Sequence, residues 1–229
     1  MKKTSDIITR SIVLLALAER IHLETLEKGT QEREEDKQEL IAFLEHFEYI
    51  DSATTRERKI LYAQVGSLMS DDCYVDNYSY YCLGVLLWSI GMVKDWKADN
   101  LNYYELLSIN EKHDLKLLEK KSVVKDIQEV LQNSEISMLM HWRTRTLSSL
   151  DSEVRKKGIK ELFINTFGEK YKNLGDVNII KKDLAWDNRP FYEYTDQDKA
   201  KIDLICFWKH YAFEWLTSKE EWDDVHTTT

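Results

Sequence analysis

The segment His141–Arg145 brings an imidazole, an indole and two guanidinium groups within five consecutive residues, His-Trp-Arg-Thr-Arg. A guanidinium group stacks on an aromatic face, and it grips a carboxylate or phosphate through paired hydrogen bonds. The segment is therefore a candidate site for an anionic ligand or partner. The alternative is structural, because Trp142 lies in register with Met138 on a helix stripe that would face a core.

Two helical spacings could place metal ligands on one face. Glu19 and His22 form one E-x-x-H step, but di-metal carboxylate sites use this step twice and the sequence has no second copy. His210 and Glu214 are four residues apart and could form a metal-ligand couple or an orienting His–carboxylate pair. No H-E-x-x-H motif accompanies them. We interpret both pairs as helix-surface features, and we predict no metal site and no cofactor.

Nucleophilic and phosphate-binding motifs are missing from the sequence. It has no G-x-x-x-x-G-K-[ST], G-x-G-x-x-G or G-x-S-x-G pattern. Cys73 follows two aspartates, whose charge raises a thiol pKa and so disfavours a nucleophile. Cys82 and Cys206 lie in apolar stretches and are expected in the core. We therefore predict no catalytic residue, and our leaning is against an enzyme.

Tryptophan is abundant, with seven residues in the chain. Buried, these indoles would fill seams between helices; exposed, they would mark a partner surface, because Trp and Arg are enriched in interface hot spots. Trp208, Trp215 and Trp222 repeat every seven residues, and Trp222 is followed by two aspartates. The candidate ligand- or partner-binding residues are Trp88, His141, Trp142, Arg143, Arg145, Trp215, Trp222, Asp223 and Asp224.

The net charge of −9 is unevenly distributed. Residues 112–182 carry 15 Lys and Arg against 10 Asp and Glu, a net +5, so the remainder carries −14. Phosphates repel a net acidic chain, which makes nucleic-acid binding an unfavoured function. The basic stretch is interpreted as solvated helix faces. Another protein is the expected partner, and the oligomeric state is left open.

The expected cellular compartment of the protein is inferred from its cysteines and its hydropathy. The three cysteines lie far apart without a C-x-x-C spacing, which suits a reducing compartment. The apolar run Ser11–Ala18 is shorter than the roughly 20 residues that a membrane span needs, and no cleavable leader is evident. We therefore expect a cytoplasmic protein that does not engage a membrane.

The fold is expected to be all-α. One proline and seven glycines in 229 residues favour long helices over hairpins. We predict a single helical domain over residues 1–229 with roughly eight to ten helices. The segment near 173–194 is expected to be irregular, and minor β-structure is left open there.

Capping signals suggest the boundaries in the first part of the chain. Ser5 is a candidate N-cap for a first helix that Gly29 would end. Residues 30–38 are charged and expected to be solvated, and they lead into an apolar stripe over 39–47. Thr54–Glu57 has the form of a capping box and predicts a helix reaching about Val65, with Gly66 as its stop.

Further helices are predicted along the rest of the chain. Residues 78–91 are apolar on nearly all sides and predict a central buried helix, entered from Asp71 and Asp72 and capped by Gly91. A short helix is expected over 102–109, and a long one over 122–150 that could break near Asn133–Ser134. Another helix over 159–167 would end at Gly168. A last helix would begin at Thr195.

Several of these segments resemble an uncharacterised, mainly bacterial family, the domain of unknown function numbered 4272. The matching segments are TRSIVLLALAER from Thr9, LLWSIG over Leu86–Gly91, HWRTR from His141, AFEWL over Ala212–Leu216 and WDDVHTTT over Trp222–Thr229. The chain departs from the family pattern where Tyr81 replaces an acidic residue, Leu139 an arginine, and Trp208–Lys209 a Glu-Arg pair. The departures imply that an activity carried by those polar residues in relatives could be lost here.

The resemblance implies a single helical domain with a docked tail. Trp222 would bury against the body of the protein, and Asp223 and Asp224 would meet Arg or Lys from the basic stretch. Three functions remain in competition. The leading one is a non-catalytic interaction protein, such as an immunity protein or antitoxin that neutralises a basic partner. The alternatives are an enzyme or ligand-binding module with a pocket of Trp88, His141, Trp142 and Arg143, and nucleic-acid binding through residues 112–182.

Overall fold

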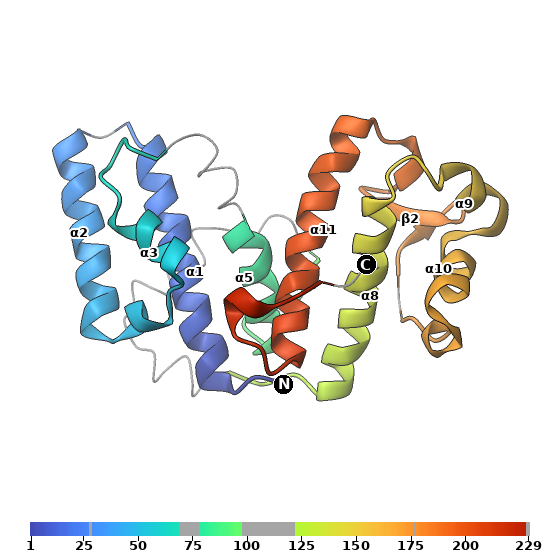
Figure 1. The fold of residues 1–229 in the computed structure, drawn as a ribbon, viewed down its shortest axis with the longest axis horizontal. Helices are drawn as coiled ribbons and strands as arrows, with labels where there is room; N and C mark the ends of the chain where they lie inside the picture. The colour runs from blue at the N-terminus through green and yellow to red at the C-terminus, as the bar shows by residue number, and fades with distance from the viewer. Residues whose placement is uncertain (28, 69–77, 98–121, 176, 228–229) are drawn as a thin grey trace. The chain divides into compact units, whose positions relative to one another are not determined.

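The fold is mainly α-helical, as predicted, with one small antiparallel sheet (Figure 1). The structure is a computed structural model that describes residues 1–27, 29–68, 78–97, 122–175 and 177–227. The α-helices in these ranges are α1 (Thr4–Thr25), α2 (Thr30–His46), α3 (Thr55–Tyr62), α5 (Tyr78–Ser89), α8 (Ile127–Arg145), α9 (Asp151–Lys157), α10 (Ile159–Phe167) and α11 (Asp196–Thr217). Short 3-10 turns are η1 (Tyr49–Ser52), η2 (Glu169–Tyr171), η3 (Phe191–Glu193) and η4 (Trp222–Asp224).

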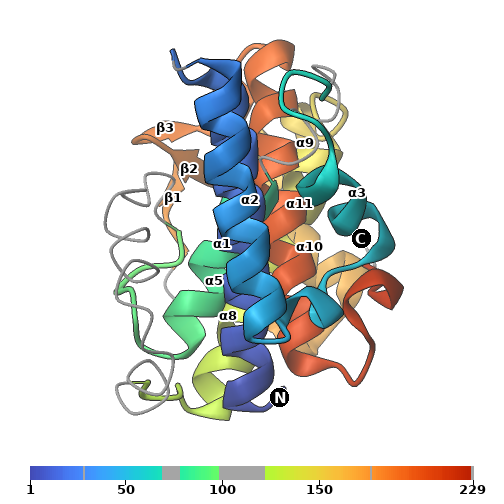
Figure 2. The same ribbon diagram turned by 90° about the vertical axis from the view of Figure 1, so that its left-hand side faces the viewer.

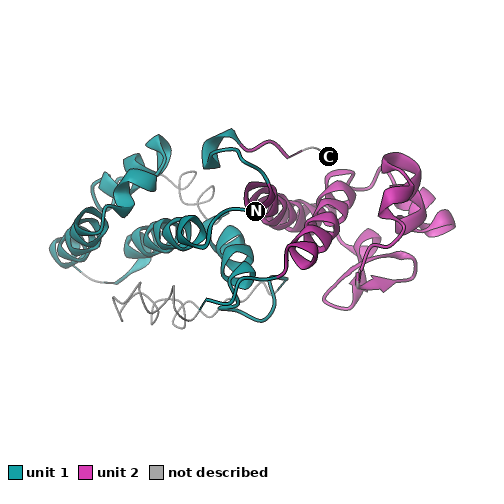
Figure 3. Ribbon diagram, turned by 90° about the horizontal axis from the view of Figure 1, so that it is seen from below, with its two compact units in different colours: residues 1–125, 218–224 teal, residues 126–217, 225–229 magenta. Residues whose placement is uncertain are grey.

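The chain forms two compact units, coloured separately in Figure 3. The first unit contains Met1–Lys125 and Ser218–Asp224, and the second contains Asp126–Thr217 and Val225–Thr229. The assignment of 1–229 to a single domain stays a prediction. Of the helices in the described ranges, none is at once long and apolar enough to cross a membrane.

Helix α1 is the centre of the first unit. Its segment Ser11–Ala18 is buried throughout, because α5 packs on it and α2 and α3 also contact it (Figures 1 and 2). Helix α5 has buried residues around nearly its whole circumference, as its sequence predicted. The apolar residues of α1 and α5 thus form the core of the first unit, and α2 and α3 pack on α1.

Two expected boundaries near the N-terminus were wrong. Lys3, not Ser5, occupies the N-cap position of α1, and the helix ends at Thr25. Gly29 is the N-cap residue of α2, so residues 30–38 form the first half of a helix rather than an independent stretch. The reason is that Glu, Gln, Lys and Arg are strong helix formers even where no apolar stripe is evident.

Of the other capping signals in the first unit, those at Thr54 and Gly91 are confirmed, whereas Gly66 is not the stop of α3. Thr54 and Glu57 form both hydrogen bonds of a capping box. Helix α3 ends at Tyr62, before the predicted Val65. Gly91 has φ 74 and ends α5 in a Schellman motif, in which its N–H and that of Met92 donate to the carbonyls of Trp88 and Leu87. The expected helix start at residues 71–72 and the expected helix over 102–109 lie outside the described residues.

Helices α8 and α11 pair in the second unit. Side-chain hydrogen bonds join His141 to His210, Thr144 to Asp203 and Ser148 to Asp196, so the helices run antiparallel. The break that the sequence allowed near Asn133–Ser134 does not occur, since α8 continues through both residues, and the Asn133 side chain donates to the Glu129 carbonyl. The predicted helix over 122–150 instead begins after Asp126 and ends at Arg145, and α9 follows separately.

The segment expected to be irregular contains the three-stranded antiparallel sheet β1-β2-β3. The strands are β1 (Ile179–Ile180), β2 (Asp183–Trp186) and β3 (Arg189–Pro190), and Leu184 pairs with Ile179 while Ala185 pairs with Pro190. Two-residue turns with positive φ at both positions join them, which matches the twist of a hairpin. Strands this short carry too little alternation to be read from sequence.

Two predicted helix ends of the second unit are confirmed, the end of α10 and the start of α11. Gly168 has φ 102 and ends α10, as predicted. The Thr195 hydroxyl accepts a hydrogen bond from the Asp198 N–H at the start of α11. Both are local signals, and both hold without help from distant residues.

Candidate functional site

The candidate residues on α8 contact three different elements. His141 contacts α11, and Trp142 packs against Phe163 and Phe167 of α10. Arg143 contacts β2 and α9. Each of these three side chains is buried, whereas Arg145 is exposed. Trp88 belongs to the first unit and is also buried. The three buried side chains of α8 therefore diverge and do not line one pocket together.

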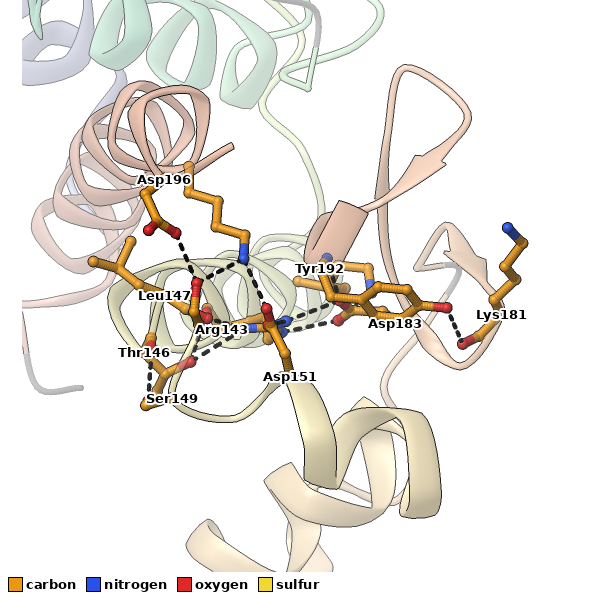
Figure 4. A network of polar contacts seen from close by, with 12 residues as sticks. Arg143, Thr146, Leu147, Ser149, Asp151, Lys181, Asp183, Tyr192 and Asp196 are labelled. Atoms are coloured by element: carbon orange, nitrogen blue, oxygen red, sulfur yellow. Dashed lines mark hydrogen bonds and ion pairs between the residues drawn. The ribbon is translucent and has the colours of Figure 1, made fainter. Parts of the chain in front are cut away.

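Arg143 is the centre of a buried ion network (Figure 4). Its Nε and Nη2 atoms donate to the two carboxylate oxygens of Asp183 at 2.9 and 3.0 Å. Its Nη2 also donates to Asp151 at 2.6 Å, and its Nη1 donates to the Leu147 carbonyl at 2.8 Å. The side chains of Arg143 and Asp183 are 0% exposed. The bidentate arginine interaction that suggested an anion site is thus formed with a carboxylate of the protein itself.

Lys199 of α11 extends this network. Its ammonium group donates to Asp151 at 2.8 Å and to the Ser148 hydroxyl at 3.0 Å. Asp183 accepts two further hydrogen bonds, from the N–H groups of Leu184 and Tyr192. Two buried cations therefore face two carboxylates, so the network is charge-balanced. It ties α8, α9, α11 and β2 together.

Sequence reasoning did not single out Asp151, Asp183 or Lys199. Each belongs to a polar stretch of sequence that matches no recognised motif, and Asp183 is 40 residues from Arg143. The only available signal was the bidentate preference of arginine itself, which says that a carboxylate or phosphate is near but not which one.

A second polar chain joins the two long helices of this unit. The Nδ1 atoms of His141 and His210 lie 3.0 Å apart, and His210 Nε2 lies 3.2 Å from a carboxylate oxygen of Glu214. The contact between His210 and Glu214 agrees with their helical spacing. The interpretation of this pair as a surface feature is wrong for His210, which is 0% exposed because it faces α8.

The histidine pair can transmit or hold a proton. One Nδ1 donates and the other accepts, while Glu214 orients the far side of the His210 ring. Burial lowers the pKa of His141 to about 4, and the positive charges of His210 and Arg145 act in the same direction. In the part of the chain that the structure describes, no group of three or more His, Cys, Asp or Glu side chains is placed to hold a metal ion.

Acid is expected to destabilise the protein through His141. Its pKa is lower in the folded chain than its ordinary value of 6.5, so the unfolded chain binds the proton more tightly. Stability from this group is therefore full above pH 6.5 and falls as the pH drops toward 4, by up to about 3 kcal/mol. Urea unfolding between these pH values measures the loss.

The matched variants for this test are His141→Gln and His226→Gln, the second at an exposed histidine. We expect the first to flatten the pH dependence and the second to leave it unchanged. An equally steep acid loss in His141→Gln would assign the effect to other groups.

The tail residues dock in the first unit, as predicted for Trp222. The Trp222 side chain is 7% exposed, and the Arg10 guanidinium lies 4.2 Å from its ring centroid. Arg10 is itself buried and forms a two-pronged ion pair with Glu57, which also accepts from the Tyr78 hydroxyl at 2.7 Å. The indole therefore covers a buried ion pair and fixes residues 218–224 on the first unit.

The two aspartates after Trp222 are exposed. Burial and then the charge of Glu57 raise the pKa of Asp223, while Arg10 acts in the opposite direction. The cation that acts on Asp223 is thus Arg10 of α1, whereas the sequence suggested a cation from residues 112–182. The reason is that the tail packs beside α1 and α3 of its own unit.

An open groove of about 600 Å³ lies between the tail and α3. Asp223 forms one part of its wall, and the exposed face of α3 forms most of the rest. The residues that line it are Ala53, Thr54, Thr55, Arg58, Lys59, Tyr62 and Asp223. Its mixed charges and width suit a protein surface better than a small ligand.

The fold and these contacts define a mainly helical protein whose candidate site residues on α8 and in the tail are ordered by internal ion pairs and aromatic packing. The chain belongs to the family described as a domain of unknown function (DUF4272), whose model matches residues 1–160. The match includes the segments from Thr9, Leu86 and His141 and ends before AFEWL and the tail. A search of curated proteins found no match, and a search of solved structures found none.

Proposed function

We propose that the protein is a non-catalytic interaction domain of the bacterial cytoplasm that binds a basic protein partner, as an immunity protein or antitoxin does. The observation that supports this proposal is the charge of α2 and η1. Residues 30–51 carry eight Asp and Glu against two Lys and Arg, a net charge of −6 in the span of one helix and one turn.

Both cations of this segment are engaged by backbone carbonyls, and Lys37 is buried while Arg33 is half-buried. Lys37 is 6% exposed and donates to the Ala63 carbonyl at 3.2 Å, and Arg33 donates to the Leu23 carbonyl at 3.1 Å. The carboxylates of Glu32, Glu35 and Glu39 are exposed and follow one another along one helix face. A concentrated field of one sign attracts a basic partner and speeds its association.

The compartment is part of the proposal. Cys82 and Cys206 are thiols buried in the core, as expected from their apolar contexts. Buried thiols that form no disulfide suit the reducing interior of a cell.

The test is to purify a partner and measure its affinity for matched charge variants. Partners are captured in host cells by cross-linking, identified, produced as pure protein and titrated by calorimetry. The variant is Glu35→Lys with Glu39→Lys, and the control is Glu161→Lys with Glu169→Lys on exposed positions of the second unit. Both double variants change the net charge by the same amount.

We expect the purified partner to bind at about 0.1 M salt and to weaken markedly near 1 M salt. The α2 variant should lose at least about tenfold in affinity, and the control should bind as the parent does. A partner that binds with no salt dependence, or that both variants bind equally well, would contradict the proposal. So would turnover of a substrate by the pure protein.

A further inference from the structure

An aromatic cluster lies at the C-terminal end of α2, and we propose that it is the point where an arginine side chain of the basic partner docks. The cluster consists of Phe43, His46, Phe47 and Tyr49. The Phe43 and Phe47 rings lie 5.2 Å apart, the Phe47 and Tyr49 rings stack at 6.0 Å, and His46 meets Phe47 edge-on at 4.6 Å. This inference rests on the proposed function and names the contact that the partner makes.

Two members of the cluster, His46 and Phe47, are open to solvent, whereas Phe43 and Tyr49 are half-buried. Phe47 is 41% exposed, and His46 is exposed beside it. By contrast, the rings of Trp88, Trp215 and Trp222 are buried. Aromatic side chains gathered at an exposed helix end contribute little burial to the fold, and they are the residue type that dominates binding hot spots.

Three features of this surface favour a cation. The exposed carboxylates of Glu45 and Glu48 adjoin the rings in sequence, whereas the nearby Asp51 is paired with Arg58 at 3.6 Å. Helix α2 ends at His46, within the cluster, and the C-terminal end of a helix carries partial negative charge. The faces of the aromatic rings attract cations as well. Charge complementarity thus selects a basic occupant.

Arginine suits the surface better than lysine does. Its planar guanidinium stacks on a ring while its edge binds a carboxylate, whereas an ammonium group is compact and strongly hydrated. A second copy of this chain is disfavoured as the occupant, because the protein carries a net charge of −9 and the surface itself is acidic. Nucleic acid is disfavoured for the same reason.

The neighbouring α3 extends the surface. The Tyr62 hydroxyl donates to Glu45 at 2.7 Å, and the Tyr62 ring is 47% exposed. Tyr62 also lines the open groove described above, so Glu45 and Tyr62 together lead from the C-terminal end of α2 to the groove. A partner segment that places its arginine on Phe47 can therefore continue along α3.

The probe for this inference is a peptide of about nine residues rich in arginine, compared with a lysine peptide of equal length and charge. Affinities are measured by calorimetry, and amide NMR shifts locate the contact. The test variant is Phe47→Ala, and the control is Leu131→Ala, at a residue of the second unit that is equally open at 40% exposed. Thermal melts confirm that both variants fold.

We expect the arginine peptide to bind the parent more tightly than the lysine peptide, with amide shifts centred on residues 43–51. Phe47→Ala should weaken the arginine peptide by about tenfold and Leu131→Ala should not change it. If the parent binds the peptide and Phe47→Ala binds it equally well, the docking point is wrong while the proposed function stands. If the parent binds neither peptide, the aromatic cluster is not an arginine-binding site. The titration with the purified partner then tests the proposed function separately.

Discussion

Replacing Asp183 with alanine is expected to lower the free energy of unfolding of the second unit by about 3–5 kcal/mol. The carboxylate accepts two hydrogen bonds from Arg143 and two more from backbone N–H groups, and it is fully buried. Without it, the guanidinium keeps only Asp151 and the Leu147 carbonyl as strong acceptors. Asp151 then faces two buried cations, Arg143 and Lys199, and a buried charge without a full partner is costly.

The measurement is urea unfolding followed by circular dichroism, with peptide-resolved hydrogen exchange to assign the loss to the second unit. Arg145→Ala, at the exposed arginine two residues along the same helix, is the control and should change stability by less than about 0.5 kcal/mol. The double variant Arg143→Met with Asp183→Leu should recover much of the loss, because it removes both charges together. Asp183→Ala within error of the parent would mean that the network contributes nothing net to stability.

Glu57→Ala should destabilise the first unit by a similar amount, about 3–5 kcal/mol. Glu57 is 1% exposed, and its carboxylate does three things at once. It balances the charge of Arg10, accepts from the Tyr78 hydroxyl and completes the capping box at the start of α3. Removing it leaves Arg10 beneath the Trp222 ring with the Ser52 carbonyl as its remaining acceptor in the described contacts.

This loss should be visible in the tail as well as in α3. Hydrogen exchange over residues 218–224 is expected to speed up together with that of residues 54–62, because Trp222 rests on the Arg10 guanidinium. Glu57→Gln keeps an oxygen acceptor but loses the charge, so its effect should be smaller. Glu39→Ala, at an exposed acidic position of α2, serves as the control. If hydrogen exchange over residues 218–224 is unchanged in Glu57→Ala, the docking of the tail does not depend on the ion pair.

The sequence predicted local features well. The capping box at Thr54, the glycine ends at Gly91 and Gly168, and the start of α11 near Thr195 were all confirmed. Each depends on hydrogen bonds between residues at most five apart, so the whole signal lies in one short window. The helical fold class was predicted from the period of the apolar residues and from the scarcity of glycine and proline.

The candidate site was harder to predict, because helix geometry separates neighbours. Successive residues of a helix are turned by about 100°, so His141, Trp142 and Arg143 point in three directions although they adjoin in sequence. Their partners lie 69, 21 and 40 residues away, at His210, Phe163 and Asp183. A sequence pattern indicates that an arginine needs an acceptor, but only the tertiary fold decides which one it meets.

The return of residues 218–224 to the first unit has a consequence for biosynthesis. The indole of Trp222, which covers the ion pair of Arg10 and Glu57, is translated only after residues 126–217 of the second unit. Until Trp222 has been translated, no indole is available to cover these two side chains. Docking of residues 218–224 on the first unit therefore follows the synthesis of the segment that separates them from it in the sequence.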